Sequence, residues 1–525
     1  MSSLADASPS FPFQMNKLFI TAAVIVLIGL LLNYLSSPST DPREPPLVKP
    51  RIPVIGHLVG LIRYQNEYFT RLGKRASKGI CSVPLFGSIT YVMWDSNLIQ
   101  SAFRNKDLSF VPFIVYVPRE VDQGGVPEKD QDTNLRLEFA KAMTEGMARD
   151  RISQMNGTAL KYITKELGAF GDGESVIDNA YVWVRNLMTV ATTEALYGSA
   201  NPLREQPSLV YDLWRFDEDL PTLLLGLFPS YTAPEGLEAR HRLEHALGEY
   251  YHNKKDANSD VSAVTHQRAN VIRKFVTTGR TIGVHELALL HVSTSNSIPT
   301  LFWFFAHIVT RPALVERIRD ELMRMVGDNA GGTVTINLDV LTEECPLIVS
   351  CYREAIRISN GAVSNREVLA DTTIQDGEGR SYLLKAGNSV RIPLDHLHKD
   401  TEAWGHDLAQ FSSDRFLQAD AAKAKLRRTS YAPFGGGKHL CPGRNFAFGE
   451  NLGFMVSFIL SFDVAPQDGN WEAFVPPKMD KCTAADAVCK PAHNGAGFGI
   501  RIKRREGWES TTWKFTSGGV DLLNL

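Results

Sequence analysis

The chain has 525 residues, of which 44% are hydrophobic and 22% are charged, an ordinary composition for a globular protein. Its formal net charge of -2 gives no global attraction to nucleic acid. The six cysteines are too sparse for a disulfide scaffold, and none is spaced as CxxC, so they favour a reducing compartment and argue against a zinc or thioredoxin-like site.

An apolar segment near the N-terminus predicts a membrane anchor. Residues 18–35 read LFITAAVIVLIGLLLNYL without a charge, which is near the lower limit for a membrane-spanning helix. A cleaved signal peptide and a soluble core helix are the alternatives, but no small-x-small cleavage site follows. Lys17 precedes the segment and Arg43, Lys49 and Arg51 follow it, and this bias places the following chain on the cytoplasmic side.

Prolines dominate the next stretch, residues 36–56. They exclude a helix and favour extended chain, so we interpret 36–56 as a spacer, with an ordinary loop as the alternative. Residues 57–505 contain no linker or repeat and are expected to form one domain. The remaining segments are an N-terminal tail at 1–17 and a C-terminal tail at 506–525, which shows no strong pattern and is expected to be loosely ordered.

Helical periodicity dominates the body of the chain. Strand-like alternation is sparse, and its better cases are SVRIPL at 389–394 and GFGIRIKR at 497–504. The sequence therefore predicts a mainly α fold with small β-sheets. The segments with apolar positions at helical spacing are 132–170, 236–253, 282–309, 310–327 and 444–462.

One cysteine has an unusual neighbourhood, in FGGGKHLCPGRNFAFGE at 434–450. A phosphate loop is excluded because His439 follows Lys438 where serine or threonine is required. A buried, inert cysteine is the ordinary alternative. Glycines, however, let the backbone approach a flat ligand, and Pro442 suits the first position of a helix. Cys441 would then lie at a helix N-terminus, where free N–H groups stabilise a thiolate suited to bind iron.

The spacing Phe434-x-x-Gly437-x-x-x-Cys441-x-Gly443 resembles the haem-binding loop of the cytochrome P450 superfamily. The resemblance implies a cytochrome P450 fold, preceded here by one N-terminal transmembrane helix. It also implies a heme b group whose iron is ligated by the Cys441 thiolate, with Phe434 packed beside the ring. His439 stands where the family often carries a basic residue that pairs with a haem propionate.

Two further signatures follow the family order. Glu354-x-x-Arg357 in YREAIR places two side chains on one helix face, and Arg415 lies in a segment similar to the family's F-x-P-x-R-F stretch, with Ser413 where proline is common. The resemblance implies a buried structural cluster of Glu354, Arg357 and Arg415, and unrelated surface charges are the alternative. Arg366, in SNREV, resembles another propionate partner, and an exposed strand arginine is nearly as good an interpretation.

The long central helix departs from the common pattern. Where most members have an acid and a threonine, this chain reads HVSTSNSIPTLFWFFAHIV from His291, and Asn296 best matches the threonine, with Ser295 and Ser297 as register alternatives. Because Pro299 lacks an N–H, the Ser295 carbonyl loses its helical partner and the helix should open near Asn296. A plain kink is the alternative. The asparagine resembles the branch with sterol 7α-hydroxylases and prostacyclin synthase.

The family's early tryptophan-to-arginine signature, which contacts haem from a helix, is missing near residue 140, where the chain reads LRLEFAKAM. This absence matches the same branch, and it leaves part of the haem cradle unassigned.

Together these signatures imply a monooxygenase that inserts one oxygen atom from O2 into a lipophilic small molecule, such as a terpenoid, steroid or polyketide-like compound. Thiolate ligation favours O–O cleavage. No GxGxxG motif follows a strand, so NADPH is expected to act through a separate NADPH–cytochrome P450 reductase, with cytochrome b5 as a further candidate partner. The expected location is the endoplasmic reticulum membrane, as a single-pass protein with a cytosolic catalytic domain.

Two other functions stay open, of which Asn296 motivates only the first. A haem-thiolate isomerase would rearrange a peroxide without a reductase, and a haem-binding sensor would bind ligands without turnover. The chain resembles biosynthetic enzymes of fungal specialised metabolism more than detoxifying enzymes.

Overall fold

The structure is a computed structural model that describes residues 40–517 except 51–55, 77–78, 86–87, 114–128, 275–278, 328–331 and 418–420, with a few positions between 20 and 31. The predicted anchor at 18–35 therefore lies largely outside the described residues. Among the described residues no single helix has the length and apolarity to cross a membrane, although Gly279–Val309 and Pro312–Val326, bent by 105°, pass the same test as a pair.

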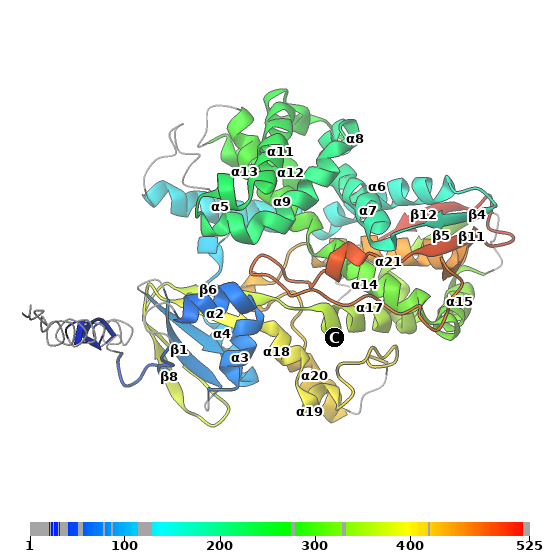
Figure 1. The fold of residues 1–525 in the computed structure, drawn as a ribbon. Helices are drawn as coiled ribbons and strands as arrows, with labels where there is room; N and C mark the ends of the chain where they lie inside the picture. Colours follow the sequence, from blue (N-terminus) through cyan, green and yellow to red (C-terminus); the bar gives the residue numbers. More distant parts are fainter. Residues whose placement is uncertain are drawn as a thin grey trace, which may run out of the picture.

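The body is mainly helical with small sheets, as predicted (Figure 1). The predicted region 132–170 forms two helices, α5 and α6, and 282–309 forms α13 and α14. Helix α7 was not predicted, because it is buried on nearly all sides and lacks an amphipathic stripe. The helices are α2 (Gly56–Tyr64), α3 (Glu67–Gly73), α4 (Ser96–Arg104), α5 (Lys129–Gly146), α6 (Arg149–Gly168), α7 (Ala180–Tyr197), α8 (Pro202–Glu205), α9 (Ser208–Leu225), α10 (Pro229–Thr232), α11 (Pro234–His252), α12 (Ala263–Ile272), α13 (Gly279–Thr294), α14 (Ser297–Val309), α15 (Pro312–Val326), α16 (Leu341–Glu344), α17 (Pro346–Ser359), α18 (Leu394–His398), α19 (Thr401–Trp404), α20 (Ala421–Ser430) and α21 (Arg444–Ser461).

The described residues form four small sheets. The largest has the order β1-β2-β9-β6-β3, in which β9 pairs parallel to β2 and antiparallel to β6. Both segments with the clearest strand pattern form strands, as β9 and β11. The strands are β1 (Ile80–Leu85), β2 (Ser88–Met93), β3 (Leu108–Ser109), β4 (Glu174–Ile177), β5 (Thr333–Asn337), β6 (Val363–Val368), β7 (Thr372–Gln375), β8 (Ser381–Leu384), β9 (Ser389–Pro393), β10 (Phe462–Pro466), β11 (Ile500–Arg504) and β12 (Thr512–Thr516).

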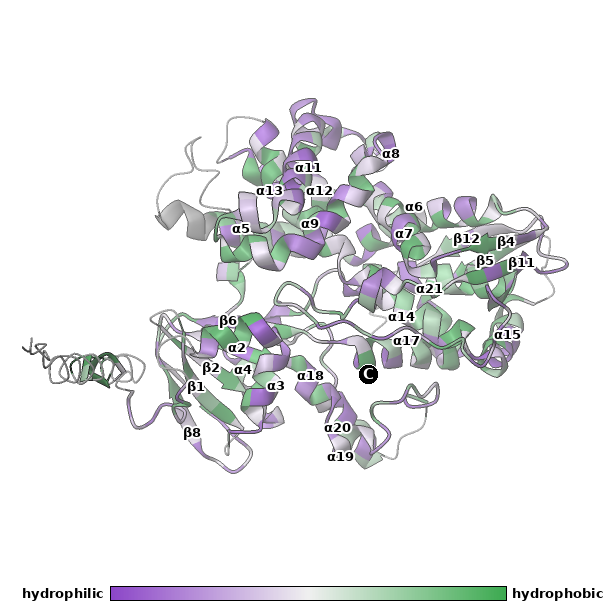
Figure 2. Ribbon diagram, viewed as in Figure 1, coloured by the Kyte–Doolittle hydropathy of each residue, from purple (hydrophilic) through white to green (hydrophobic). Residues whose placement is uncertain are grey.

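The helices α14, α17 and α21 pack together at the centre, between the five-stranded sheet on one side and the β10-β11-β4 sheet on the other (Figure 1). Both α14 and α21 carry mostly hydrophobic residues, whereas α20 is hydrophilic (Figure 2). Buried side chains from all three central helices belong to one hydrophobic core. Burial of this apolar surface is the main term that holds the site elements in place.

Part of the predicted spacer is built into the five-stranded sheet. The Ser82 N–H donates to the Pro46 carbonyl at 2.9 Å, and the Tyr91 hydroxyl donates to the Glu44 carboxylate at 2.6 Å. Leu47 forms a parallel bridge with Ser82. The described residues from 43 to 48 therefore pack on the body.

The prediction of a loosely ordered tail at 506–525 is wrong for the part that the structure describes. Strand β12 pairs parallel to β5, and Trp508 is only 3% exposed. The stacked rings of Trp508 and Trp513, 5.8 Å apart, fix this strand on the body. Because this pairing joins segments that lie far apart in sequence, it cannot be predicted from local alternation of apolar and polar residues.

Candidate functional site

The segment before Cys441 is a tight loop closed by backbone hydrogen bonds. The Cys441 N–H donates to the Phe434 carbonyl at 3.0 Å, and the Leu440 N–H donates to the Gly437 carbonyl at 3.3 Å. Gly437 has a φ of +63°, and a Cβ there would stand 2.0 Å from the carbonyl oxygen of Phe103. Glycine is therefore required at 437, and the loop holds Cys441 directly before α21.

The Cys441 sulfur receives hydrogen bonds from the start of α21. The backbone N–H groups of Gly443 and Arg444 and the charge of Arg444 act to lower the pKa of the Cys441 thiol, but burial outweighs them and raises it. Helix α21 begins at Arg444 after the N-cap Gly443, so the expectation that Pro442 takes the first helical position is wrong. The expected N–H donors still reach the sulfur, and metal coordination would supply the remaining stabilisation of the thiolate.

The surroundings of Cys441 fit a haem. A Cβ added at Gly443 would meet no atom within 4 Å. Leu440, beside the cysteine, is an apolar side chain that is 39% exposed. Uncovered apolar surface beside a partly exposed sulfur donor is what a large flat hydrophobic group would cover.

Arg366, a predicted propionate partner, is buried rather than exposed on its strand. It is 3% exposed and donates to the Ser364 hydroxyl at 2.9 Å and to the Asn365 carbonyl at 2.7 Å. A longer contact of 3.4 Å reaches the Gly436 carbonyl in the cysteine loop. Burial lowers the pKa of Arg366 to about 10, and no described acidic residue pairs with it. Its position therefore suits an anion that comes with a ligand.

His439, the other predicted propionate partner, is half-buried in the same area. Its Nε2 accepts the Phe110 N–H at 3.2 Å, which leaves the ring proton on Nδ1. Burial and the nearby charges of Arg366 and Lys438 lower the pKa of His439 to about 4. Since no described carboxylate lies beside it, the imidazole is neutral and offers a neutral N–H donor rather than a second cation.

Glu354, Arg357 and Arg415 lie together as a buried cluster. Arg357 Nε donates to Glu354 Oε2 at 2.7 Å, and Arg415 Nε donates to Glu354 Oε1 at 2.8 Å. Other guanidinium N–H groups donate to the carbonyls of His398 at 2.9 Å and Trp404 at 2.6 Å. Because these buried charges are paired and hydrogen-bonded, the cluster can rigidly hold together the segments that it joins.

The charge cluster is linked to the cysteine loop. The Ala432 N–H donates to His398 Nε2 at 3.2 Å, and the Tyr431 hydroxyl donates to the Arg353 carbonyl at 3.1 Å. The Asn360 side chain also reaches the Pro433 carbonyl, at 3.4 Å. The segment that leads into the loop is thus anchored on α17.

The predicted opening of the central helix is confirmed. Helix α13 ends at Thr294 and α14 begins at Ser297, with Asn296 at φ -114° between them. The Thr300 N–H bonds to the Asn296 carbonyl at 3.2 Å, whereas Pro299 offers no N–H to the Ser295 carbonyl. Helix α21 packs beneath the break, where the Asn451 side chain donates to the Ser297 carbonyl at 3.2 Å.

The Asn296 side chain has a partner that the sequence did not suggest. Its Oδ1 accepts the Ala487 N–H at 2.9 Å. Ala487 belongs to a loop whose two ends are bridged between Met479 and Pro491. The residue in the threonine position therefore ties the helix break to a distant loop.

A second buried ionic cluster was also missed. Asp217 on α9 bonds to His291 Nε2 on α13 at 2.9 Å and contacts the Lys490 ammonium, which bonds to Asp486 at 2.7 Å. The two carboxylates raise the pKa of Lys490 against the opposing effect of burial. These residues are far apart in sequence, and only a histidine inside an apolar helix gave a signal.

Glu450 on α21 is a third residue that was missed. It is fully buried, and its Oε2 accepts the Thr192 hydroxyl at 2.9 Å. Burial raises the pKa of Glu450 to about 8, since the hydroxyls of Ser297 and Thr192 offset only part of the desolvation. A lone carboxylate inside the apolar run AFGENLGFMVSFIL was the available signal.

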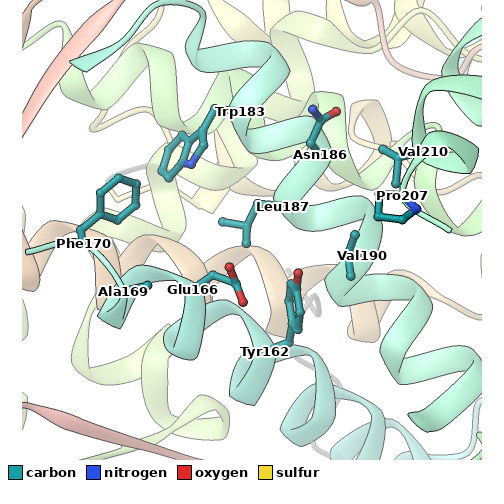
Figure 3. A pocket seen from close by; sticks show the side chains of 10 residues that line it. All are labelled: Tyr162, Glu166, Ala169, Phe170, Trp183, Asn186, Leu187, Val190, Pro207 and Val210. Atoms are coloured by element: carbon teal, nitrogen blue, oxygen red, sulfur yellow. The ribbon is translucent and has the colours of Figure 1, made fainter. Parts of the chain in front are cut away.

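A pocket of about 510 Å³ opens on α6, α7 and the start of α9, away from these residues (Figure 3). None of the side chains that line it belongs to the predicted site. They are Tyr162, Glu166, Ala169, Phe170, Trp183, Asn186, Leu187, Val190, Pro207 and Val210.

Comparison with known proteins relates the chain, and the region that holds this site, to one family. The family model described as Cytochrome P450 matches residues 281–483, a range that holds the helix break, the charge cluster and Cys441. A "Cytochrome P450 monooxygenase" of Gibberella zeae is 43% identical over 502 residues, which cover 95% of each chain.

Two mammalian relatives are more distant. "Cytochrome P450 7B1" of Mus musculus is 24% identical over 482 residues, 88% of this chain and 92% of its own. The "25-hydroxycholesterol 7-alpha-hydroxylase" of Rattus norvegicus is 28% identical over 216 residues, 39% of this chain and 51% of its own.

Proposed function

We propose that this chain inserts one oxygen atom of O2 into a lipophilic small molecule in specialised metabolism. The premise is that the chain belongs to the cytochrome P450 family and is a cytochrome P450 monooxygenase. The observation that carries the proposal is the glycine loop that presents the Cys441 sulfur to the N–H groups of Gly443 and Arg444. A haem ligated by this thiolate supplies the activation of dioxygen when it is bound.

Residues of the chain would bind the haem and handle water and protons. Cys441 would ligate the iron, and Arg366 and the Nδ1–H of His439 would hold a propionate. Phe434, whose carbonyl closes the loop, would pack beside the ring. Asn296 lies in a helix break where the Ser295 carbonyl lacks its usual helical N–H donor at Pro299, so polar groups are available there to orient water or move a proton.

The substrate class is proposed as terpenoid, steroid or polyketide-like. The apolar side chain of Val292, one turn before Asn296, supports an apolar substrate. The name of the rat relative, a 25-hydroxycholesterol 7-alpha-hydroxylase, supports a sterol-like skeleton. Electrons would come from NADPH through a separate NADPH–cytochrome P450 reductase, with cytochrome b5 as a further donor, and residues 18–35 would anchor the chain in the endoplasmic reticulum membrane with the catalytic domain in the cytosol.

A haem-thiolate isomerase is the second candidate, because Asn296 replaces the usual threonine and its Oδ1 is already engaged by the Ala487 N–H. Turnover of a panel of terpenoid and steroid precursors separates the two functions. The monooxygenase requires NADPH, reductase and O2, and its product gains one oxygen atom. Conversion of a lipid peroxide to an isomer without NADPH or reductase would instead identify an isomerase.

A further inference from the structure

Two arginines on adjacent strands, Arg366 buried and Arg391 partly buried, have no acidic partner among the described residues. Arg366 is on β6, and Arg391 is on β9. Burial lowers the pKa of both guanidinium groups. Within the described part of the chain, Arg391 makes neither a hydrogen bond nor an ion pair. A cation that is partly or wholly removed from water without a counter-ion is costly, so a ligand is expected to bring the missing negative charge.

An aromatic pair connects the two arginines to the cysteine loop. The Arg366 guanidinium lies 5.9 Å from the ring centre of Phe110, and the Arg391 guanidinium lies 5.5 Å from that of Phe113. The two rings stack at 6.0 Å, and His439 contacts Phe110 edge-on at 6.3 Å. All three basic side chains therefore border one aromatic cluster.

An amide beside Arg391 also lacks a partner. Asn365 lies opposite Arg391 in the β6–β9 ladder, so the two side chains share one face of the sheet. The Oδ1 of Asn365 is buried and has no hydrogen-bond partner among the described residues. This side chain is free to turn an N–H toward an anion held by Arg391, and a guanidinium with an amide is a donor set suited to a carboxylate.

We propose that Arg391 binds a carboxylate that a ligand brings, in an anion position distinct from that of Arg366 and His439. The inference rests on the proposed function, because haem carries two carboxylates and Arg366 with His439 accounts for one. A carboxylate on the substrate is the other source of the same chemistry. Arg391 is thus either the second haem anchor or the residue that selects acidic substrates.

Haem loss tests the first source. Wild type and the variants R391Q and R391K are mixed with excess apomyoglobin, and haem transfer is followed by absorbance. If Arg391 holds a haem carboxylate, R391Q loses haem about tenfold faster, as expected for a lost charge-assisted hydrogen bond, and R391K recovers part of the difference.

A matched control removes a different arginine that also stacks on phenylalanine. Arg311 lies 5.1 Å from the Phe411 ring centre and donates to the His307 carbonyl at 2.6 Å, outside the site. R311Q is expected to leave the rate of haem loss within about twofold of wild type, because it touches no ligand.

Binding of dodecanoate and its methyl ester tests the second source. If Arg391 binds a substrate carboxylate, dodecanoate binds wild type, as seen by a Soret shift, and R391Q weakens it about tenfold with no effect on the ester. The variant N365D places a carboxylate beside Arg391, so it should raise the unfolding midpoint of the apoprotein and weaken dodecanoate binding or speed haem loss.

The proposal is overturned if R391Q loses haem at the wild-type rate while dodecanoate either fails to bind wild type or binds R391Q equally well. The reduced, carbon monoxide-bound spectrum is recorded for every variant. Loss of thiolate ligation in wild type would refute the proposed function itself, whereas a normal spectrum with unchanged haem loss and dodecanoate binding refutes only the role of Arg391.

Discussion

Among single residues, Glu450 is expected to give the fold a pH dependence. Its pKa rises from 4.5 to about 8 on burial, so it is neutral in the folded protein at pH 7. In the unfolded chain the Glu450 carboxyl ionises near its ordinary pKa of 4.5. Between pH 4.5 and about 8 the unfolded chain is therefore ionised while the folded protein is not, so the free energy of unfolding falls as the pH rises through this range. The variant E450Q cannot ionise and should not show this loss.

Thermal unfolding of wild type and E450Q at pH 5, 7 and 8.5 measures the effect. Relative to E450Q, wild type is expected to lose roughly 2–4 kcal/mol of unfolding free energy between pH 5 and 8.5. Parallel curves for the two proteins would show that Glu450 is ionised or solvated in the folded state.

The charge cluster around Glu354 makes a second prediction at this scale. Glu354→Ala leaves Arg357 and Arg415 without their shared carboxylate, which should cost about 3–5 kcal/mol of unfolding free energy and release the haem. Denaturant unfolding and haem content measure both effects. The control Arg317→Ala breaks the half-exposed Arg317–Asp414 pair and should cost only about 0–1 kcal/mol; equal losses would mean that the buried cluster does not rigidly hold together the segments that it joins.

At the level of elements, the break between α13 and α14 makes a prediction that needs no substrate. Pro299→Ala restores an N–H for the Ser295 carbonyl, so residue 299 should gain a slowly exchanging amide as the helix closes. The bond from Ala487 to Asn296 should weaken, and the Ala487 amide should exchange about five- to tenfold faster. Hydrogen exchange read by mass spectrometry or NMR measures both amides.

Asn296→Ala is the matched control for this element. It removes the acceptor of the Ala487 N–H and leaves Pro299 in place, so only the Ala487 amide should exchange faster. If Pro299→Ala left both amides unchanged, the break would be imposed by packing against α21 and not by the missing N–H.

Elements could be predicted from the sequence where their signal is local. The opening at Pro299 follows from one missing N–H, and α11, α15 and α21 follow from helical periodicity. Helix α7 gave no stripe because it is buried on nearly all sides, and β12 depends on a partner strand far away in sequence. Within the site, residues in sequence motifs, such as Cys441, could be predicted. Arg391 lies in no motif, and its proposed role is inferred only from its neighbours across the sheet.

For the whole molecule, the N-terminal boundary can be tested by two deletions. Removal of residues 1–39 takes away the expected anchor and leaves the contacts from Pro46 and Glu44 to the sheet. This protein is expected to keep its unfolding midpoint and to shift from the membrane fraction to the supernatant. Removal of residues 1–50 also removes these sheet contacts and should lower the unfolding midpoint. If the protein that lacks residues 1–39 stayed in the membrane fraction, the predicted anchor would be contradicted.

Ligation of haem iron by Cys441 is the central claim, and the carbon monoxide difference spectrum of the reduced, purified protein tests it most directly. Wild type is expected to show the Soret shift typical of thiolate-ligated haem, and Cys441→Ala should abolish it. A wild-type spectrum without the shift, or an unchanged spectrum in Cys441→Ala, would contradict the account.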